Sequence, residues 1–484
     1  MGTTTTVLIT LIVYKILLIG IGLWASRRVA SESDYFLAGQ NLGPWTAGLS
    51  YAASTSSAWV LLGFTGAVFT TGLTALWLVP GIFGGYLLTW LVIGPSLNAE
   101  TRERGHITIV DFVSADATGY IRRMIRWAMA TIILFCFVFY IASQFQAAGN
   151  ALSEAFGLGV TEAILIGALV IVIYCFFGGF WAASITDALQ AVVMLTACLI
   201  VPWAMVSSLG GLSAVFDQLH ATADPDWFHF DGGQAGLLGT GVAMGLLGTG
   251  LGALGQPQLL NRIMAVRSQA ERRKGALITI VWGTLIYSGL VILACAARAV
   301  VLETGTESVI FAAARAYLPA VLAGVVIAAV LSAVMSTVDS LLLASASAVS
   351  HDSDIPFRNP LLAGRLAMIG VAAVAILLTL TLPQDIFSRV LFAWVALGAA
   401  FGPAVITRAL GWRVRPAFTL AAILFGFATA VTAYGIAGTL SDVIEKWGSW
   451  AIGLLILFAG RTHELRQADD TDGARHGEEP SLLP

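Results

Sequence analysis

The chain has 484 residues, of which 58% are hydrophobic and 11% are charged, and its mean hydropathy is +0.86. Soluble domains are about one quarter charged, so this composition excludes a water-soluble surface for most of the chain and predicts a lipid environment. The formal net charge of −3 and the absence of a basic tract argue against a nucleic-acid partner.

Apolar stretches of about twenty residues, the length needed to cross a bilayer, predict thirteen membrane-spanning helices. Their approximate centres are residues 15, 58, 85, 137, 170, 195, 247, 287, 332, 372, 398, 425 and 452. The first stretch, from about Thr6 to Trp24, has no basic residue before it, and Arg27 and Arg28 follow it directly. A secretory signal has the opposite charge order, so we expect this segment to remain as a first span with its N-terminus outside.

The distribution of basic residues supports this orientation. With the N-terminus outside, the predicted inner segments hold 20 of the 25 Lys and Arg residues, and the outer segments hold Arg298, Arg315, Arg389 and Lys446. Short loops rich in basic residues face the cytoplasm. We therefore predict one transmembrane domain over residues 1–461 in a bacterial inner membrane. The polar, acidic residues 462–484 should form a disordered cytoplasmic tail.

The second and seventh spans contain residues that disfavour a continuous helix. The second includes the run of small and hydroxyl residues from Leu49 to Trp59, and the seventh includes the glycine-rich run from Gly245 to Pro257. The two spans are five apart and cross the bilayer in opposite senses. Paired interruptions of this kind indicate a transporter site near the middle of the membrane. Close helix packing through small residues is the alternative for either segment alone.

The ninth span carries a stripe of oxygen donors formed by Ser336, Thr337, Asp339 and Ser340, which lie three or four residues apart. A small hard cation such as Na⁺ prefers several oxygen ligands. Two hydroxyls from this stripe, with backbone carbonyls freed near Ala53 and Ser56, would form such a cage. The alternative is that these hydroxyls bond back to their own helix.

Two carboxylates and two aromatic residues are further candidates. Asp187 and Asp339 lie within predicted spans, where an ionisable group is a functional candidate by default. Asp187 also fits an ordinary helix N-cap, whereas Asp339 lies in mid-helix. Trp59 and Tyr140 fall beside the expected cavity, where each either contacts a solute or packs structurally.

Enzymatic signatures are weak. The sequence Gly250-Leu-Gly-Ala-Leu-Gly255 matches a dinucleotide-binding fingerprint, but that motif requires a strand-to-helix turn, and here it lies in an apolar span. The chain has no HExxH, P-loop or GxSxG motif, so we do not expect an enzyme. The four cysteines lie in apolar runs without CxxC spacing, which indicates neither a disulfide framework nor a metal site.

Six ordered motifs resemble the sodium:solute symporter family, and most closely its bacterial sodium/proline symporters. The resemblance extends from the first span to about residue 410 and is looser beyond it. The motifs are Asp34 to Pro44, Ser57 to Phe69, Gly178 to Phe180 with Thr186-Asp187, Gly255 to Pro257, Ala333 to Thr337, and Gly398 to Pro403.

The resemblance implies an all-α fold with about thirteen transmembrane helices. Ten of them would form a five-plus-five inverted-repeat core, with one extra N-terminal and two extra C-terminal helices. Core repeat one would cover about 44–206 and core repeat two about 236–410. The resemblance assigns the main sodium site to Ala53, Ser56, Ala333, Ser336 and Thr337, and a second cation site, present in some members, to Asp187, Asp339 and Ser340. It assigns solute contacts to Ser54, Thr55, Ser57, Trp59, Tyr140, Gln144, Thr249, Ala253 and Gln256.

Four positions depart from the proline-symporter pattern. Thr55 stands where those proteins have aspartate, Gln40 where they have arginine, and Thr249 and Ala253 where they have aromatic residues. We hypothesise that Asp339 supplies the missing negative charge. Without the two aromatic side chains the pocket would be larger, so a bulkier amino acid, a small carboxylate or another compatible solute fits as well as proline.

The sequence therefore predicts a secondary active transporter that imports a small polar solute with Na⁺ by alternating access, with no obligate protein partner evident. One alternative is proton coupling through Asp187 or Asp339. Another is a nutrient sensor of the same fold.

Overall fold

The computed structural model describes residues 3–26, 31–177, 179–234, 236–382, 385–436 and 438–462. Within these ranges the regular structure is helical, and extended pairing is limited to the isolated bridges Leu42–Val266 and Val414–Arg461. The predicted disordered tail falls on residues 463–484, outside the described residues, apart from Thr462.

The long uninterrupted helices form most of the bundle. They are α1 (Thr3–Ser26), α8 (Gly119–Phe156), α9 (Val160–Phe177), α10 (Phe180–Ser208), α14 (Gln269–Ala299), α16 (Ala320–Ser350), α17 (Pro360–Thr381), α18 (Ile386–Ala409) and α19 (Pro416–Tyr434).

Four further spans are built from helical segments of different winding. They are α3 (Pro44–Thr55), η2 (Trp59–Phe64) and α4 (Thr65–Thr71); η3 (Gly72–Trp77), α5 (Leu78–Leu87), η4 (Leu88–Ile93) and α6 (Gly94–Arg104); α12 (Leu237–Gly248), η6 (Thr249–Gly255) and α13 (Pro257–Met264); and α20 (Thr439–Val443), η8 (Ile444–Gly448) and α21 (Ser449–Ala459). Short helices connect the spans, namely α2 (Glu32–Leu37), η1 (Ala38–Gln40), α7 (Ile109–Ser114), α11 (Leu212–Thr222), η5 (Pro225–Phe228), η7 (Thr306–Ser308) and α15 (Val309–Tyr317).

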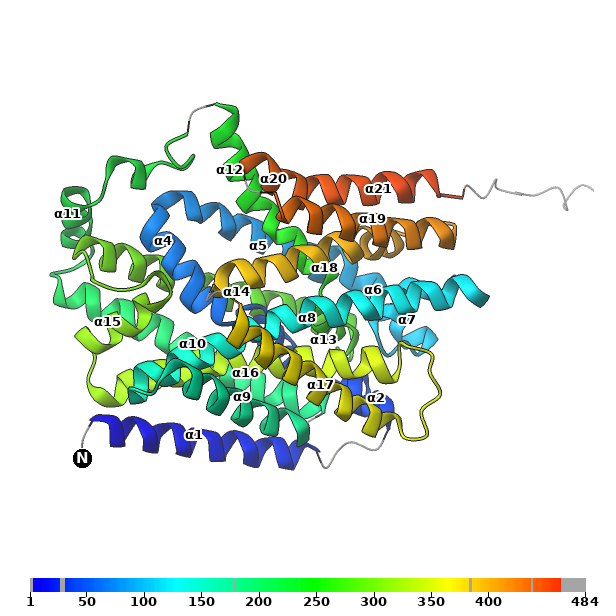
Figure 1. Ribbon diagram of the computed structural model, residues 1–484, viewed down its shortest axis with the longest axis horizontal. Helices are drawn as coiled ribbons and strands as arrows, with labels where there is room; N and C mark the ends of the chain where they lie inside the picture. Colours follow the sequence, from blue (N-terminus) through cyan, green and yellow to red (C-terminus); the bar gives the residue numbers. More distant parts are fainter. Residues whose placement is uncertain are drawn as a thin grey trace, which may run out of the picture.

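The long helices run side by side along the longest axis of the molecule (Figure 1). The short helices α11 and α15 lie at one end of the bundle, called here the α15 end, and α2 and α7 lie at the other, called the α7 end. Among the described residues, nine helical stretches are long and apolar enough to cross a membrane. Twelve of the thirteen predicted span centres fall within these helices, and the remaining one, residue 58, lies at the break between α3 and η2. The prediction of an all-α polytopic membrane protein is confirmed.

Helix α16 is the central helix of the bundle. It packs against α1, α8, α10 and α17, and 78% of its most apolar window is buried. In contrast, α17 at the periphery buries only 28% of its window and exposes Leu366, Leu377 and other large apolar side chains. Such a surface suits lipid rather than water. The polar residues of α16 are therefore shielded from lipid by neighbouring helices.

The contact between η6 and α18 depends on two glycines. A Cβ atom at Gly252 would lie 2.0 Å from the Trp394 ring, and one at Gly398 would lie 2.4 Å from the Gly252 Cα. A larger residue at Gly252 would require the Trp394 side chain to move, and one at Gly398 would require the backbone of η6 to move. This close approach holds the seventh span against α18, next to the candidate site described below.

Candidate functional site

The second span is interrupted where its sequence predicted. Helix α3 ends at Thr55, and Ser56 leaves the helical region with φ −93° and ψ 52°. The Thr55 hydroxyl donates to the Tyr51 carbonyl, one turn back in the same helix. Hydroxyl side chains that bond nearby backbone compete with helix formation, which explains why the run of Ser and Thr residues ends the helix here.

Helix α8 compensates for the interruption. The Ala58 backbone N–H donates to the Gln144 Oε1 at 3.1 Å, and the Tyr140 hydroxyl donates to the Ser57 Oγ at 3.2 Å. The Gln144 Nε2 also reaches the Ser57 Oγ at 3.5 Å. Unwound backbone inside a membrane needs partners from other parts of the protein. Tyr140 and Gln144, both predicted solute contacts, therefore have a structural role at the break.

The seventh span is interrupted as well. Segment η6 winds as a tighter 3₁₀ helix, and Gln256 is extended at φ −85° and ψ 109° before α13 begins at Pro257. The Gln256 Nε2 donates to the carbonyls of Gly252 at 3.1 Å and Trp394 at 2.9 Å. The Trp394 Nε1 donates to the Thr249 carbonyl at 2.9 Å. The prediction of two interrupted spans is confirmed. Trp394 of α18 forms hydrogen bonds with Gln256 and with the Thr249 carbonyl at the second interruption.

The predicted main sodium residues lie together between α3 and α16. The Ser336 Oγ lies 3.3 Å from the Ala53 carbonyl oxygen and 3.2 Å from that of Ala333. The Thr337 Oγ1 lies 3.4 Å from the Ser54 carbonyl oxygen. Ser336 thus bonds back to its own helix and also reaches the broken helix. The back-bonding is observed, whereas sodium binding by this stripe stays a prediction.

The fifth predicted residue, Ser56, has a fully buried hydroxyl without a well-aligned hydrogen bond among the described residues. The Tyr86 hydroxyl approaches it and Thr55. Every oxygen contributed by the five predicted sodium residues belongs to a backbone carbonyl or a hydroxyl, so the group, called here the neutral cage, carries no formal charge. Its members are Ala53, Ser56, Ala333, Ser336 and Thr337, all with no exposed surface.

A charged group lies one helical turn farther along α16. The Ser340 Oγ donates to the Ser336 carbonyl at 2.7 Å and lies 3.1 Å from the Ser54 Oγ, which links it to the neutral cage. On its other side, Ser340 accepts from the Arg262 Nη2 at 2.6 Å, and the same nitrogen lies 2.7 Å from the Asp187 Oδ2.

Ser50 completes this charged group, called here the ionic layer and comprising Ser50, Asp187, Arg262, Asp339 and Ser340. The Ser50 Oγ donates to the Asp187 Oδ2 and accepts from the Arg262 Nε, both at 2.7 Å. Sequence reasoning placed Asp187 and Ser340 together but missed Ser50 and Arg262. Arg262 had been counted only as a basic residue of an inner loop, yet only 1% of its side chain is exposed.

The two aspartates of the ionic layer differ in their surroundings. Helix α10 begins at Phe180 with Gly179 as its N-cap, so the interpretation of Asp187 as a helix N-cap is wrong. Asp187 instead pairs with Arg262 from within the helix. The Asp339 Oδ1 accepts from the Ser340 hydroxyl at 3.1 Å, whereas its Oδ2 is buried without a hydrogen bond among the described residues.

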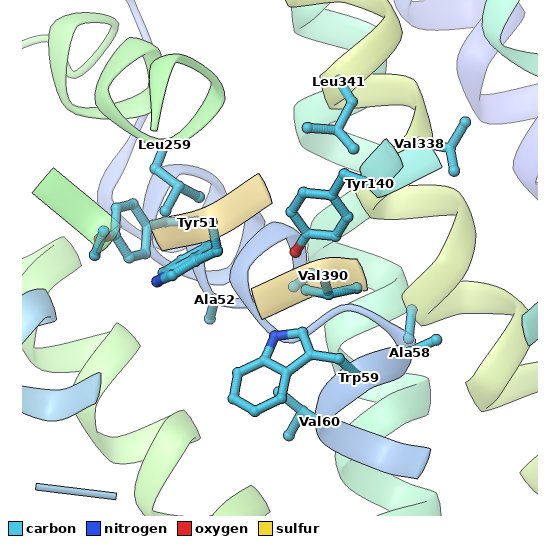
Figure 2. Packing of buried hydrophobic residues seen from close by; sticks show 14 of the residues in the cluster. Tyr51, Ala52, Ala58, Trp59, Val60, Tyr140, Leu259, Val338, Leu341 and Val390 are labelled. Carbon is cyan, nitrogen blue, oxygen red and sulfur yellow. The ribbon is translucent and has the colours of Figure 1, made fainter. Parts of the chain in front are cut away.

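The predicted solute contacts are all buried and surround the two breaks. They are Ser54, Thr55, Ser57, Trp59, Tyr140, Gln144, Thr249, Ala253 and Gln256. Figure 2 shows Trp59 and Tyr140 with their polar atoms turned toward the region between them. Within the described part of the chain, the Trp59 Nε1 and the Thr249 Oγ1 are buried polar atoms without a hydrogen-bond partner.

Sequence reasoning missed three further aromatic residues near these contacts. The Tyr86 hydroxyl approaches Tyr287 as well as Thr55, and both tyrosines are buried. The Phe387 ring of α18 lies 6.0 Å from the Trp59 ring. Tyrosine in an apolar stretch gives no sequence signal that separates lipid-facing from pocket-facing positions. Only the packing of α5, α14 and α18 identifies these residues.

A second charged cluster lies at the α7 end and was also missed. The His351 Nε2 lies 2.9 Å from the Asp111 Oδ2, and the His351 Nδ1 lies 3.1 Å from the Glu32 Oε1. The Arg126 Nη1 lies 2.6 Å from the Asp111 Oδ1, and the Thr108 hydroxyl donates to Asp352 at 2.6 Å. Helices α2, α7, α8 and the end of α16 are joined there.

The α7-end cluster shifts the pKa values of its members. Burial alone would lower the pKa of His351, but the hydrogen bond to Asp111 and the surrounding carboxylates raise it to about 9. Burial, together with the charge of Asp111, raises the pKa of Asp352 to about 7. Burial opposes ionisation of Asp111 too, yet His351 and Arg126 hold the pKa of that carboxyl well below its usual range.

Comparisons with known proteins agree with this architecture. Residues 35–426 match the model of the sodium:solute symporter family. The chain is 31% identical to a high-affinity proline transporter of Bacillus subtilis, over 90% of this chain and 94% of that protein. It is 30% identical to a sodium/proline symporter of Escherichia coli, over 94% of this chain and 93% of that protein.

Two solved structures share the fold at low sequence identity. One is a substrate-bound, outward-open Na⁺-coupled sialic acid symporter, with a TM-score of 0.77 and 17% identity over 94% of this chain and 99% of that one. The other is a nucleobase-cation-symport-1 family transporter in a closed conformation, with a TM-score of 0.57 and 15% identity over 89% of this chain and 95% of that one.

Proposed function

Since the chain belongs to the sodium:solute symporter family, and is therefore a membrane transporter rather than an enzyme, we propose that it imports a small polar solute with Na⁺ by alternating access. The observation that carries the proposal is the neutral cage. Its hydroxyls, Ser336 and Thr337 on α16, lie 3.3 to 3.4 Å from the carbonyl oxygens of Ala53 and Ser54 on the broken helix α3.

Sodium acts in this proposal as a bridge between two helices. An ion coordinated by Ser336, Thr337, Ala333 and the carbonyls around Ala53 and Ser56 would favour the conformation in which α3 and α16 are in contact. A ligand shifts a conformational equilibrium only through its different affinity for the two states. The membrane potential then contributes about 2.3 kcal/mol per charge per 100 mV to inward movement of the ion.

We propose a proline-like amino acid or a small carboxylate as the solute. The named relatives that transport proline support this class. The Trp59 Nε1 and the Thr249 Oγ1 are buried donors without hydrogen-bond partners among the described residues, and a solute carboxylate would satisfy them. Thr249 and Ala253 stand where the resemblance places aromatic residues of proline symporters, so we propose that this chain accepts a side chain larger than the proline ring.

The orientation in the membrane is also a proposal. The predicted inner segments, rich in basic residues, lie at the α7 end, so this end would face the bacterial cytoplasm and the α15 end would face outside. Core repeat one would then cover about 44–206 and core repeat two about 236–410. Each would contribute one interrupted span to the site.

Proton coupling is the second candidate, because the Asp339 Oδ2 is a buried carboxylate oxygen without a partner among the described residues. Uptake into proteoliposomes separates the two. Sodium symport requires that an inward Na⁺ gradient drives accumulation of radiolabelled proline or of a ligand found by thermal-shift screening of amino acids and carboxylates. Accumulation that persists without Na⁺ and collapses with the proton gradient would contradict sodium coupling.

A further inference from the structure

Arg262 lies where the family resemblance placed a second cation. Its Nη2 is 2.7 Å from the Asp187 Oδ2 and 2.6 Å from the Ser340 Oγ, and these are two of the three side chains assigned to that site. A guanidinium stays charged at every physiological pH. The second cation site of this chain therefore already contains a positive charge, attached covalently to α13.

The other donors of Arg262 also end on oxygen atoms. The Nε donates to the Ser50 Oγ at 2.7 Å, and the Nη1 donates to the Gln258 carbonyl at 2.5 Å. The guanidinium also lies 5.4 Å from the centre of the Phe180 ring. A hydroxyl, a carbonyl and a carboxylate are the ligands that a sodium ion would use, so the guanidinium engages the oxygens available to a second ion.

Burial shows that this arrangement is built into the fold. The Arg262 side chain is 1% exposed and that of Asp187 is fully buried. Four helices supply the contacts, with Ser50 on α3, Asp187 on α10, Arg262 on α13 and Ser340 on α16. A guanidinium with this little exposure requires charged and polar partners, because an unpaired buried charge is strongly unfavourable.

We propose that Arg262 is a tethered second cation, occupying Asp187 and Ser340 in place of a second sodium ion, so that one sodium ion accompanies each solute. The proposal rests on the sodium coupling proposed above. In this proposal Arg262 sets the number of sodium ions that are transported with each solute. The neutral cage by itself does not determine that number.

The charge balance of the ionic layer supports a single ion in the neutral cage. One guanidinium lies opposite two carboxylates, and the Asp339 Oδ2 has no hydrogen bond within the described residues. The Ser340 hydroxyl connects this layer to the Ser336 carbonyl. An ionised Asp339 would leave one negative charge unbalanced about one turn from the neutral cage, where it would favour a cation among ligands that have no charge of their own.

The first test uses the unaltered protein. In proteoliposomes, the membrane voltage at which net solute flux stops under a fixed Na⁺ gradient gives the number of sodium ions per solute. We expect one, with a Hill coefficient for sodium of about 1. Two ions per solute would overturn the role of Arg262 and leave sodium symport intact. Solute uptake without any sodium dependence would instead overturn the proposed function.

The second test removes the guanidinium. Arg262→Met, purified and folded, should bind a second ²²Na⁺ ion per protein and raise the Hill coefficient toward 2, because Asp187 and Ser340 become available. Arg262→Met combined with Asp187→Asn should return the count to one, and Arg262→Lys should keep it at one. Arg267→Met, which removes an exposed arginine just beyond α13, is the matched control.

A single bound sodium ion in folded Arg262→Met would overturn the proposal. Should that variant fail to fold, the stoichiometry of the unaltered protein and of Arg262→Lys decides. A count of two in either of them contradicts a tethered second cation, and a count of one in both supports it.

Discussion

The neutral cage and the ionic layer lie one helical turn apart on α16, yet they are held together in opposite ways. The neutral cage consists of carbonyls and hydroxyls at contact distances of 3.2 to 3.4 Å, whereas the ionic layer contains hydrogen bonds of 2.6 to 2.7 Å around a guanidinium. Longer contacts between neutral oxygens leave a place for an ion that enters and leaves. Short charged contacts fix a cation that belongs to the chain.

This difference predicts that loss of the Asp187–Arg262 ion pair of the ionic layer affects folding, whereas damage to the neutral cage affects sodium binding. The four predictions below test that division in order of decreasing free-energy effect. The first two concern charged groups and stability, and the last two concern sodium affinity.

Asp187→Ala should have the largest effect. It leaves the Arg262 guanidinium buried without its carboxylate, and loss of one partner of a buried ion pair typically costs about 3–5 kcal/mol. Thermal unfolding of the detergent-purified protein measures the loss. Glu154→Gln, which removes the partner of the exposed Arg315, is the control and should stay within about 1 kcal/mol. Equal stability of the two variants would refute the structural role of the ionic layer.

The α7-end cluster extends the comparison to charged groups that solvent reaches. Because the folded-state pKa of His351 is raised to about 9, its contribution to stability is complete below about pH 6.5 and is lost as the pH rises through 9. The loss amounts to at most about 3 kcal/mol. The pKa of Asp352 is raised to about 7, so its contribution to stability is also lost as the pH rises, in this case through 7.

Melting temperatures measured from pH 6 to pH 9.5 test this sign. His351→Gln should be less stable than the unaltered protein at pH 6, and the gap should close by pH 9.5. His229→Gln, in the segment between α11 and α12, is the control for removing a histidine. A gap that widens with rising pH would contradict the assignment of a protonated His351 between Asp111 and Glu32.

Ser336→Ala tests the neutral cage. Loss of one hydroxyl ligand should raise the sodium concentration for half-maximal uptake about tenfold, equivalent to about 1.4 kcal/mol, with little change in the melting temperature without sodium. Ser345→Ala is the matched control, because that buried hydroxyl on α16 donates to the Leu341 carbonyl of its own helix at 2.8 Å. An equal sodium concentration for half-maximal uptake in both variants would contradict the proposal that the neutral cage binds sodium.

Asp339→Asn should have the smallest effect of the four. The substitution removes negative charge near the neutral cage without removing a cage ligand, so sodium affinity should fall about threefold, or about 0.6 kcal/mol. The comparison is the sodium dependence of uptake in this variant and in Asp385→Asn, which changes the N-cap residue of α18. Unchanged sodium dependence in Asp339→Asn would end the hypothesis that Asp339 supplies the charge that Thr55 lacks.

Much of the fold could be predicted from local features of the sequence. Apolar length placed twelve of the thirteen span centres in helices, and the other at the break of the second span, because a span must satisfy its own backbone hydrogen bonds in lipid. The run of Ser and Thr after Leu49 and the glycines before Pro257 predicted both interruptions, because these residues disfavour a helix wherever they occur. The hydroxyl stripe of α16 was predicted for the same reason, since residues three or four apart share a helix face.

The partners of the charged groups could not be predicted in this way. Arg262 looks like a loop arginine in the sequence, and only the return of α13 into the bundle, between α3, α10 and α16, buries it beside Asp187. His351 meets Asp111 across 240 residues, and Tyr86 of α5 approaches Thr55 of α3 and Tyr287 of α14. The sequence by itself determined which segments span the membrane and where they break, because hydropathy and helix propensity are local properties. The tertiary structure decided which charges pair, because pairing in a helical bundle depends on the packing of segments that are distant in the chain.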